Sequence, residues 1–492
     1  MIKLRGLLPT VVAACVMASM QACAEMGDAT QTICADGTDK LCSTLPTDMA
    51  GHPPMIGYIP STSAGGTGGF NQTFIDYFGW QAFVALNWPV DKNGKPSTTE
   101  TIVTDTTSPR VWSTYATKEE VFDPQVVGVD DSDCGDDDPG TLKVFRTSKF
   151  QLTSFIEAFT PYPLIDRNGN FVVYDVRLND TEVNYLERNN LTTKQGQKAF
   201  GKPYDFTAGE GAKVGSIEIK TAWRIMTDKD DAGSFYTTDA TIVVPPKFSQ
   251  TGKQLCIDDV KVGLVGMHIM QKFTNPSDFS DFWSWATFEH VNNAPLADNA
   301  PVSQINAASK LKDPSPPSCS LAPNPADKTQ YSFYNVACND GKSACAVNAP
   351  PSALGDVFKW SEKQPYASAY LTKGKGGALF GTQVARCFDI YDSADAVTND
   401  YHSQFGNSVW KNYMLVGVQW AAAGNTGSGP FAKLKPFPAP VYLANTTLET
   451  YVQDTSVEDP KSGAGSCIIC HNLAKDTAGN DSNFSFLPHA AQ

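Results

Sequence analysis

One stretch decides how this chain folds: Val262-Gly263-Leu264-Val265-Gly266-Met267-His268-Ile269-Met270. It contains neither a charged residue nor a proline, which is typical of a strand that is buried on both faces. Side chains alternate along a strand, so we expect His268 to share a face with Leu264, Gly266 and Met270. On that face, Gly266 would let a flat ring approach the backbone closely.

Further runs of β-branched or alternating residues extend this prediction to much of the chain. They are residues 171–176, which follow an Asn-Gly turn, 216–220, 241–244 and 413–418. Three stretches predict helices instead: residues 71–87, ended by Pro89, residues 180–191, with Asp180 as the N-cap, and residues 393–405. The sequence therefore predicts a β-rich α+β fold with an antiparallel body and a few helices.

The composition is that of a globular protein with little affinity for polyanions. Of the 492 residues, 41% are hydrophobic and 18% are charged, so there is enough apolar material for a large core. The formal net charge of −14 opposes attraction to phosphate backbones or anionic lipid surfaces. We expect no nucleic-acid partner.

The N-terminal segment, residues 1–24, has the features of a signal peptide. Lys3 and Arg5 precede an apolar stretch that is too short to span a bilayer, and Ala22-Cys23-Ala24 fits a signal-peptidase site. We expect export to the periplasm or the extracellular space after cleavage near Glu25, with a lipid anchor on Cys23 as the alternative. No other segment reaches the roughly 18 apolar residues of a transmembrane helix, so we do not expect a transmembrane protein.

Composition divides the rest of the chain into four parts. A flexible lead-in rich in Gly, Ser and Thr covers residues 25–69, and the β-rich body begins at residue 70 and runs to 295. Residues 296–350 form an irregular insertion rich in Pro and Cys, and residues 351–492 complete the body. Loops stapled by disulfides are therefore expected between the regular elements.

The cysteines support export. Two of the twelve lie in the signal region and two form a separate pair near the C-terminus, which leaves eight. Eight cysteines permit four disulfides in an oxidising compartment, with a connectivity that sequence leaves open. Two pairs are close enough in sequence to form locally, Cys34 with Cys42 and Cys338 with Cys345.

The separate pair belongs to Cys467-Ile468-Ile469-Cys470-His471, the C-x-x-C-H sequence that attaches c-type haem. Two thiols at this spacing reach the two vinyl groups on one edge of the porphyrin, and the adjacent histidine ligates the iron. The alternatives are a plain disulfide or half of a zinc site, but a zinc site usually needs a second Cys or His pair, which the sequence lacks. We expect one covalent haem c held by Cys467, Cys470 and His471.

The short tail restricts the other axial position of the iron. The segment from Asn472 to Gln492 contains no methionine, so any second protein ligand must come from upstream. Two histidines are candidates, His268 first and then His290, which follows two tryptophans and Glu289. Glu289 could hydrogen-bond an imidazole or move protons. The alternative is that both histidines are ordinary core residues bonded to backbone carbonyls.

Several of these segments resemble a family of exported bacterial proteins that carry one C-terminal haem-c motif. The matching stretches are residues 78–89, 218–224, 263–272, 283–295 and 466–487. The end of the chain, with Asn483-Phe484-Ser485-Phe486, also resembles the small β-sandwich cytochromes that oxidise hydroxylamine with a lysine-cross-linked haem. That resemblance implies an antiparallel β-sandwich-like body with haem docked by the C-terminal segment. It leaves open whether Lys220 or Lys272 takes the cross-linking part.

These observations favour an exported monohaem c-type cytochrome that transfers electrons. Two alternatives remain: a haem enzyme acting on a small molecule of the peroxide or hydroxylamine type, and a haem sensor that binds a gas. The expected partner is accordingly a redox protein or a small-molecule substrate. Other catalytic motifs, such as G-x-S-x-G and H-E-x-x-H, are absent from the sequence.

Overall fold

The computed structural model describes the greater part of the body of the chain. The described residues are 41–47, 72–122, 142–143, 162–274, 281–298, 300–302, 319, 330–338, 345–351, 358–422, 440–454 and 465–492. The predicted signal peptide and most of the predicted lead-in fall outside them.

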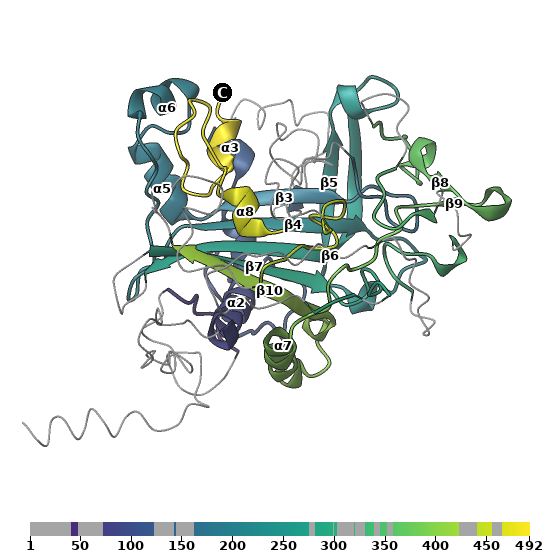
Figure 1. Cartoon of the computed structure of the whole chain (residues 1–492), viewed down its shortest axis with the longest axis horizontal. Coiled ribbons are helices and arrows are strands. Elements are labelled where there is room, and N and C mark those ends of the chain that lie inside the picture. Colours follow the sequence, from purple (N-terminus) through teal and green to yellow (C-terminus); the bar gives the residue numbers. More distant parts are fainter. Residues whose placement is uncertain are drawn as a thin grey trace, which may run out of the picture.

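One large sheet organises the described residues (Figure 1). Its eight strands are β1 (Ala116–Thr117), β2 (Leu142–Lys143), β3 (Val173–Leu178), β4 (Ile217–Ile225), β5 (Thr237–Val244), β6 (Leu255–Thr274), β7 (Asp281–His290) and β10 (Tyr413–Ala422). The strand order is β1-β3-β4-β6-β5-β2, and β7 pairs with both β6 and β10. All pairs are antiparallel except β2 with β5. A small hairpin, β8 (Thr372–Lys373) and β9 (Leu379–Phe380), stands apart from this sheet.

Helices cover the sheet on two sides (Figure 1). On one side lie α2 (Gln72–Leu86) and α7 (Asp392–Phe405), which contact each other and β10. On the other side lie α3 (Lys118–Phe122), α5 (Asp180–Arg188), α6 (Lys194–Phe200) and α8 (Cys467–His471). We call the first side the helix face and the second, which residues 440–454 and 465–492 cover, the C-terminal face.

The predicted elements are present with shifted ends. The helices expected at residues 71–87 and 393–405 are α2 and α7, and the expected strands are found as β3, β4, β5, β6 and β10. The helix expected at 180–191 ends earlier, at Arg188, and its N-cap is Asn179 rather than Asp180. The Asn179 side chain accepts a hydrogen bond from the Glu182 backbone N–H. The β-rich antiparallel body with few helices is confirmed.

Hydrogen bonds join all eight of these strands into one sheet. Strand β6 is 20 residues long, and its two halves pair with different partners. Its first half pairs with β5 and its second half with β7, while β4 pairs along the opposite edge. Strands β5 and β7 therefore lie one after the other along the same edge of β6, and the sheet branches there.

A β-bulge in β6 changes which residues share a face. Ala222 pairs with Gly266 but the next residue, Trp223, pairs with Leu264, so Val265 has no partner on β4. Leu264 therefore packs in the core of the helix face, whereas Gly266, His268 and Met270 lie on the C-terminal face. The expectation that Leu264 shares the face of His268 is wrong, because an inserted residue reverses the alternation of side chains.

Disulfides staple the loops, as expected. Cys338 bonds Cys345, which is one of the two local pairs foreseen, and Cys319 bonds Cys387. Cys42 and Cys256 are also in disulfide bonds. Cys34 falls outside the described residues, so the second local pair stays a prediction.

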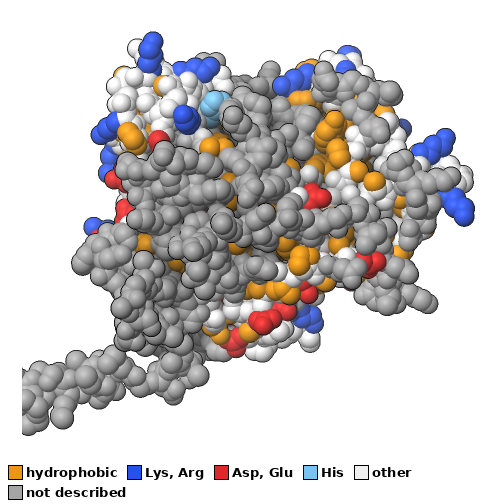
Figure 2. Space-filling view, viewed as in Figure 1, with side chains coloured by type: hydrophobic (Ala, Val, Ile, Leu, Met, Phe, Trp, Pro, Cys, Tyr) orange, Lys and Arg blue, Asp and Glu red, His pale blue; other side chains and the backbone are white. Residues whose placement is uncertain are grey.

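Two further features concern the outside of the molecule. In the part of the chain that the structure describes, no helix is long and apolar enough to cross a membrane. In the view of Figure 2, lysine and arginine side chains gather over the α5–α6 end and over the β8–β9 hairpin. The middle of this face shows mainly apolar and acidic side chains where it is not grey.

Candidate functional site

Helix α8 carries the C-x-x-C-H motif and is fixed to the sheet by β10. Gln419 accepts a hydrogen bond from the Ile468 backbone N–H at 3.2 Å and donates to the Pro440 carbonyl at 2.7 Å. Ile468 and Ile469 are fully buried in the core of the C-terminal face. Positions three and four apart lie on one side of a helix, so Cys467, Cys470 and His471 share the other side and remain partly exposed.

His471 is oriented by the chain that follows it. Its Nδ1 lies 2.7 Å from the Phe484 carbonyl oxygen, which can only accept, so Nδ1 donates and Nε2 keeps its lone pair. The imidazole contacts the rings of Trp285 and Phe486, with centroid distances of 5.8 and 5.2 Å. Although the His471 side chain is partly exposed, the groups packed around it desolvate the imidazole and lower its pKa to about 4, so the ring is neutral at neutral pH and competent to ligate a metal.

The two motif cysteines differ from the other described cysteines. Cys467 and Cys470 are free thiols, whereas the six other described cysteines are in disulfides. Burial, and secondarily the negative charge of Glu449, raises the pKa of the Cys470 thiol to about 12 and that of Cys467 well above its usual value. Reactive or redox-active cysteines have lowered pKa values, so this environment disfavours thiolate chemistry at the pair.

Two central strands each have one partly exposed residue next to α8. Every residue of β4 is buried except Lys220, and between Val262 and Phe273 every residue of β6 is buried except His268. Lys220 and His268 are direct cross-strand partners. The covering layer on the C-terminal face is therefore incomplete above this pair.

A third side chain, that of Glu449, lies beside the Lys220–His268 pair. Glu449 belongs to segment 440–454, which covers this face of the sheet. Its Oε2 lies 3.3 Å from Nε2 of His268 and accepts a hydrogen bond from the Asn445 backbone N–H at 2.9 Å. Burial would raise the pKa of Glu449, but the neighbouring His268 and Lys220 lower it more, to below its usual value. The carboxylate is thus ionised at neutral pH. On the same face of β6, Met270 packs in one cluster with Cys467, and its cross-strand partner Trp285 contacts His471. His268, two residues from Met270, therefore lies beside the motif with Lys220 and Glu449.

The structure separates the two candidate histidines. His268 lies beside the motif, whereas His290 is buried in the body: its ring stacks on Phe235 at 3.9 Å and its Nε2 donates to the Ser234 carbonyl at 2.8 Å. His402 donates to the Tyr413 carbonyl from α7, and His489 lies in the last turn of the chain. Of these described histidines, only His268 contributes to the shift in the pKa of His471.

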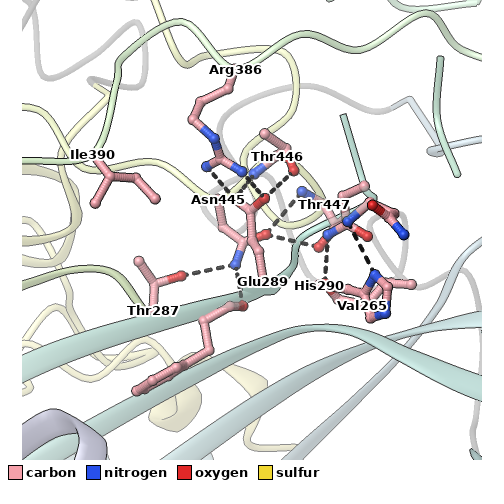
Figure 3. A network of polar contacts seen from close by, with 12 residues as sticks. Val265, Thr287, Glu289, His290, Arg386, Ile390, Asn445, Thr446 and Thr447 are labelled. Carbon is pink, nitrogen blue, oxygen red and sulfur yellow. Dashed lines mark hydrogen bonds and ion pairs between the residues drawn. The ribbon is translucent and has the colours of Figure 1, made fainter. Parts of the chain in front are cut away.

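Two other expected residues have structural partners. Glu289 was a candidate to hydrogen-bond an imidazole, but its carboxylate is held by Arg386 and Thr446 instead (Figure 3). Lys272 is fully buried and its Nζ lies 2.9 Å from Asp205 and 3.5 Å from Asp281. Between the two lysines that the resemblance left open, Lys220 is therefore the one beside the motif.

Sequence reasoning missed Glu449. It lies far from His268 along the chain, in a loop that is rich in Thr and Asn and matches no catalytic motif. No pattern in the sequence indicates that this loop folds onto β6. The signal that was available is Gly266, because a Cβ atom there would clash with Oγ1 of Thr447. A glycine in a buried strand indicates close approach of another segment, although it does not say which one.

Comparisons with known proteins give no relatives: no family model matches the chain, and neither curated proteins nor solved structures match it significantly. Within the described residues, no group of three or more His, Cys, Asp or Glu side chains is arranged to hold a metal ion. Any conclusion on function must therefore come from the residues around α8.

Proposed function

We propose that this protein is an exported monohaem c-type cytochrome that carries one haem on Cys467 and Cys470 and transfers electrons. His471 supplies the proximal ligand through Nε2, and the C-terminal segment docks the group against the sheet. A bound haem would supply a one-electron iron couple. The protein residues attach it, orient it and set its electrostatic surroundings.

The observation that carries the proposal is the incomplete covering of β4 and β6 beside the motif. Lys220 and His268 are the partly exposed exceptions in strands that are otherwise buried, and they lie on the face that α8 covers. A strand interior exposed at one cross-strand pair, next to a free C-x-x-C-H motif, is what a planar group attached to α8 would cover. A disulfide or a half zinc site would leave it uncovered.

The hydrogen bonding of His471 and of Trp285 also supports a haem bound next to α8. The Phe484 carbonyl fixes the tautomer of His471 with Nε2 available, the usual arrangement of a metal-ligating histidine. Nε1 of the buried Trp285 finds no acceptor among the described residues, although its ring lies beside His471. Buried indole N–H groups normally have a partner, and a polar substituent of a bound group would provide one.

A second function, a haem enzyme acting on a small protonated molecule of the peroxide or hydroxylamine type, is favoured by one specific observation. His268 and Glu449 form a histidine–carboxylate pair whose side chains are partly exposed, although the Nε2 atom facing Glu449 is buried, and Lys220 lies beside the pair. Such a pair can accept a proton from a molecule bound nearby and return it. A simple electron carrier needs no such group, since a rigid and well-insulated site suffices for electron transfer.

The optical spectrum of the reduced protein with and without carbon monoxide tests the proposal and separates the two functions. A c-type haem spectrum that carbon monoxide leaves unchanged supports electron transfer. A rapid shift on adding carbon monoxide indicates an open site and favours the enzyme or a gas sensor. Absence of a haem spectrum in protein made with a c-type maturation system overturns both functions.

A further inference from the structure

A buried ion pair is hydrogen-bonded to Thr446, which belongs to the segment that carries Glu449 (Figure 3). Glu289 on β7 is fully buried, and the Arg386 guanidinium contacts both of its oxygens, at 3.2 and 2.7 Å. Thr446 adds two donors to the same carboxylate: its backbone N–H at 2.6 Å and its Oγ1 at 2.5 Å. Four donors therefore converge on Glu289, which is the full complement that satisfies a buried carboxylate.

The neighbouring Asn445 connects this ion pair to the candidate site. Its Nδ2 donates to Oγ1 of Thr287 at 2.8 Å and to the Phe288 carbonyl at 2.9 Å. Its Oδ1 accepts from the backbone N–H and from Oγ1 of Thr447. Its own backbone N–H donates to Oε2 of Glu449, the oxygen that lies 3.3 Å from His268.

The register of the sheet explains why this segment reaches His268. Gly266 pairs with Glu289, and His268 pairs with Thr287, so the anchors of the segment lie directly beside these two residues of β6. The lack of a side chain at Gly266 lets Thr447 lie against β6. The chain then turns back, with the Glu449 backbone N–H donating to the Asn445 carbonyl at 2.9 Å. This turn aims the Glu449 carboxylate at His268.

We propose a positioning network that holds the Glu449 carboxylate beside His268 on the C-terminal face, next to the proposed haem. The network consists of Glu289, Arg386, Thr446 and Asn445. None of the four is assigned to touch haem or substrate, so each acts through Glu449. This inference rests on the proposed haem function. It adds that the charge beside the haem is set by residues that no motif marks.

Two matched variants test the inference, because Thr446 and Thr450 are both buried in this segment and each donates one hydroxyl hydrogen bond. Thr446 Oγ1 donates to the Glu289 carboxylate, whereas Thr450 Oγ1 donates to a backbone carbonyl, that of Thr446, at 2.7 Å. Thr446→Val and Thr450→Val therefore remove the same group at similar cost in packing. Only Thr446→Val removes a donor to the Glu289 carboxylate. Both keep the buried ion pair, whose direct replacement can prevent folding.

The measurement is the midpoint reduction potential of the covalently loaded full-length mature protein. A negative charge near the iron stabilises its oxidised form, so Glu449→Gln should raise the potential. Thr446→Val should raise it in the same direction by part of that shift, and Thr450→Val should leave it unchanged. In a Glu449→Gln background, Thr446→Val should add nothing, because its effect passes through Glu449.

The outcomes separate the inference from the proposed function. Equal potentials in Thr446→Val and Thr450→Val overturn the inference, as do an unchanged potential in Glu449→Gln or an additive shift in the double variant. In each of these cases the loaded protein still carries haem, so the proposed function stands. If the wild-type protein takes up no covalent haem, the proposed function is overturned and the inference with it.

Discussion

Lys220 and His268 lie opposite each other on β4 and β6, and each is the partly exposed exception in a buried stretch of its strand. The sheet supplies rigid placement, because both strands are paired on both edges near this point. The loop that carries Glu449 brings a carboxylate to the pair. The site beside the C-x-x-C-H motif therefore has charged side chains that are partly exposed and are held on rigid strands.

His268→Ala tests which upstream residue faces the iron. We expect the variant to keep covalent haem but to change the ferric spin state or the affinity for an added ligand such as cyanide. His402→Ala is the matched control, since it removes the same ring from α7 on the helix face. Visible and electron paramagnetic resonance spectra of both variants give the answer. Unchanged spectra in His268→Ala, or an equal change in His402→Ala, would contradict the placement.

Lys220→Met tests the sign of the electrostatic field at the site. Removal of a positive charge near the iron destabilises the reduced form, so the midpoint potential should fall. The shift should be opposite in sign to that of Glu449→Gln. Lys261→Met on the exposed end of β6 is the control, because Lys261 pairs with Asp239 in solvent and should leave the potential unchanged. A rise in Lys220→Met, or equal shifts in both lysine variants, would refute this assignment of the charge.

His290 gives the protein a specific sensitivity to acid. Burial lowers the pKa of His290 to about 4, against 6.5 for an exposed histidine. Between these values the unfolded chain binds a proton that the folded protein does not, so the free energy of unfolding falls as the pH drops from 6.5 towards 4. The shift corresponds to a loss of about 3 kcal/mol from this residue.

Urea unfolding at a series of pH values measures this effect. His290→Gln should be less stable than wild type at neutral pH, because it loses the stacking on Phe235. Its stability should change less between pH 6.5 and 4. Parallel pH profiles for the two proteins would show that His290 does not cause the sensitivity.

Gly266→Ala tests the close approach of the covering segment. A Cβ atom at this position would clash with Oγ1 of Thr447 and lie 3.1 Å from Oδ1 of Asn445, so the segment must shift. We expect a loss of about 1–3 kcal/mol in the free energy of unfolding, the usual cost of overpacking. Gly233→Ala is the control, because its Cβ would meet Asp231 at 3.4 Å, an ordinary contact. Equal stability of Gly266→Ala and wild type would contradict the packing of Thr447 on β6.

The sequence was sufficient for the elements and for the motif, because both depend on local patterns. Helical spacing located α2 and α7, and the uncharged run 262–270 located the centre of β6. It was insufficient at Leu264, since the bulge at Val265 has no local signature. It also missed Glu449, whose place depends on a distant loop folding back onto the sheet.

For the same reason, the sequence could rank His268 ahead of His290 as the candidate upstream ligand but could not locate either of them relative to the motif. His268 and His290 both lie in strands with apolar neighbours, and sequence cannot say which strand face a distant segment covers. The glycine beside His268 favoured it, and the structure shows Thr447 against that glycine. Glu289 was misjudged for a similar reason: its partner, Arg386, is distant in the sequence and meets it only in the folded chain.

The central claim is covalent attachment of haem to Cys467 and Cys470, and one measurement tests it most directly. The mature protein is produced with a c-type maturation system, extracted with acidic acetone and weighed by mass spectrometry. The account predicts that the protein keeps its colour and gains the mass of one haem, because thioether bonds resist extraction, and that Cys467→Ala/Cys470→Ala loses both. A wild-type protein that is colourless after extraction and has the mass of the bare chain would contradict it.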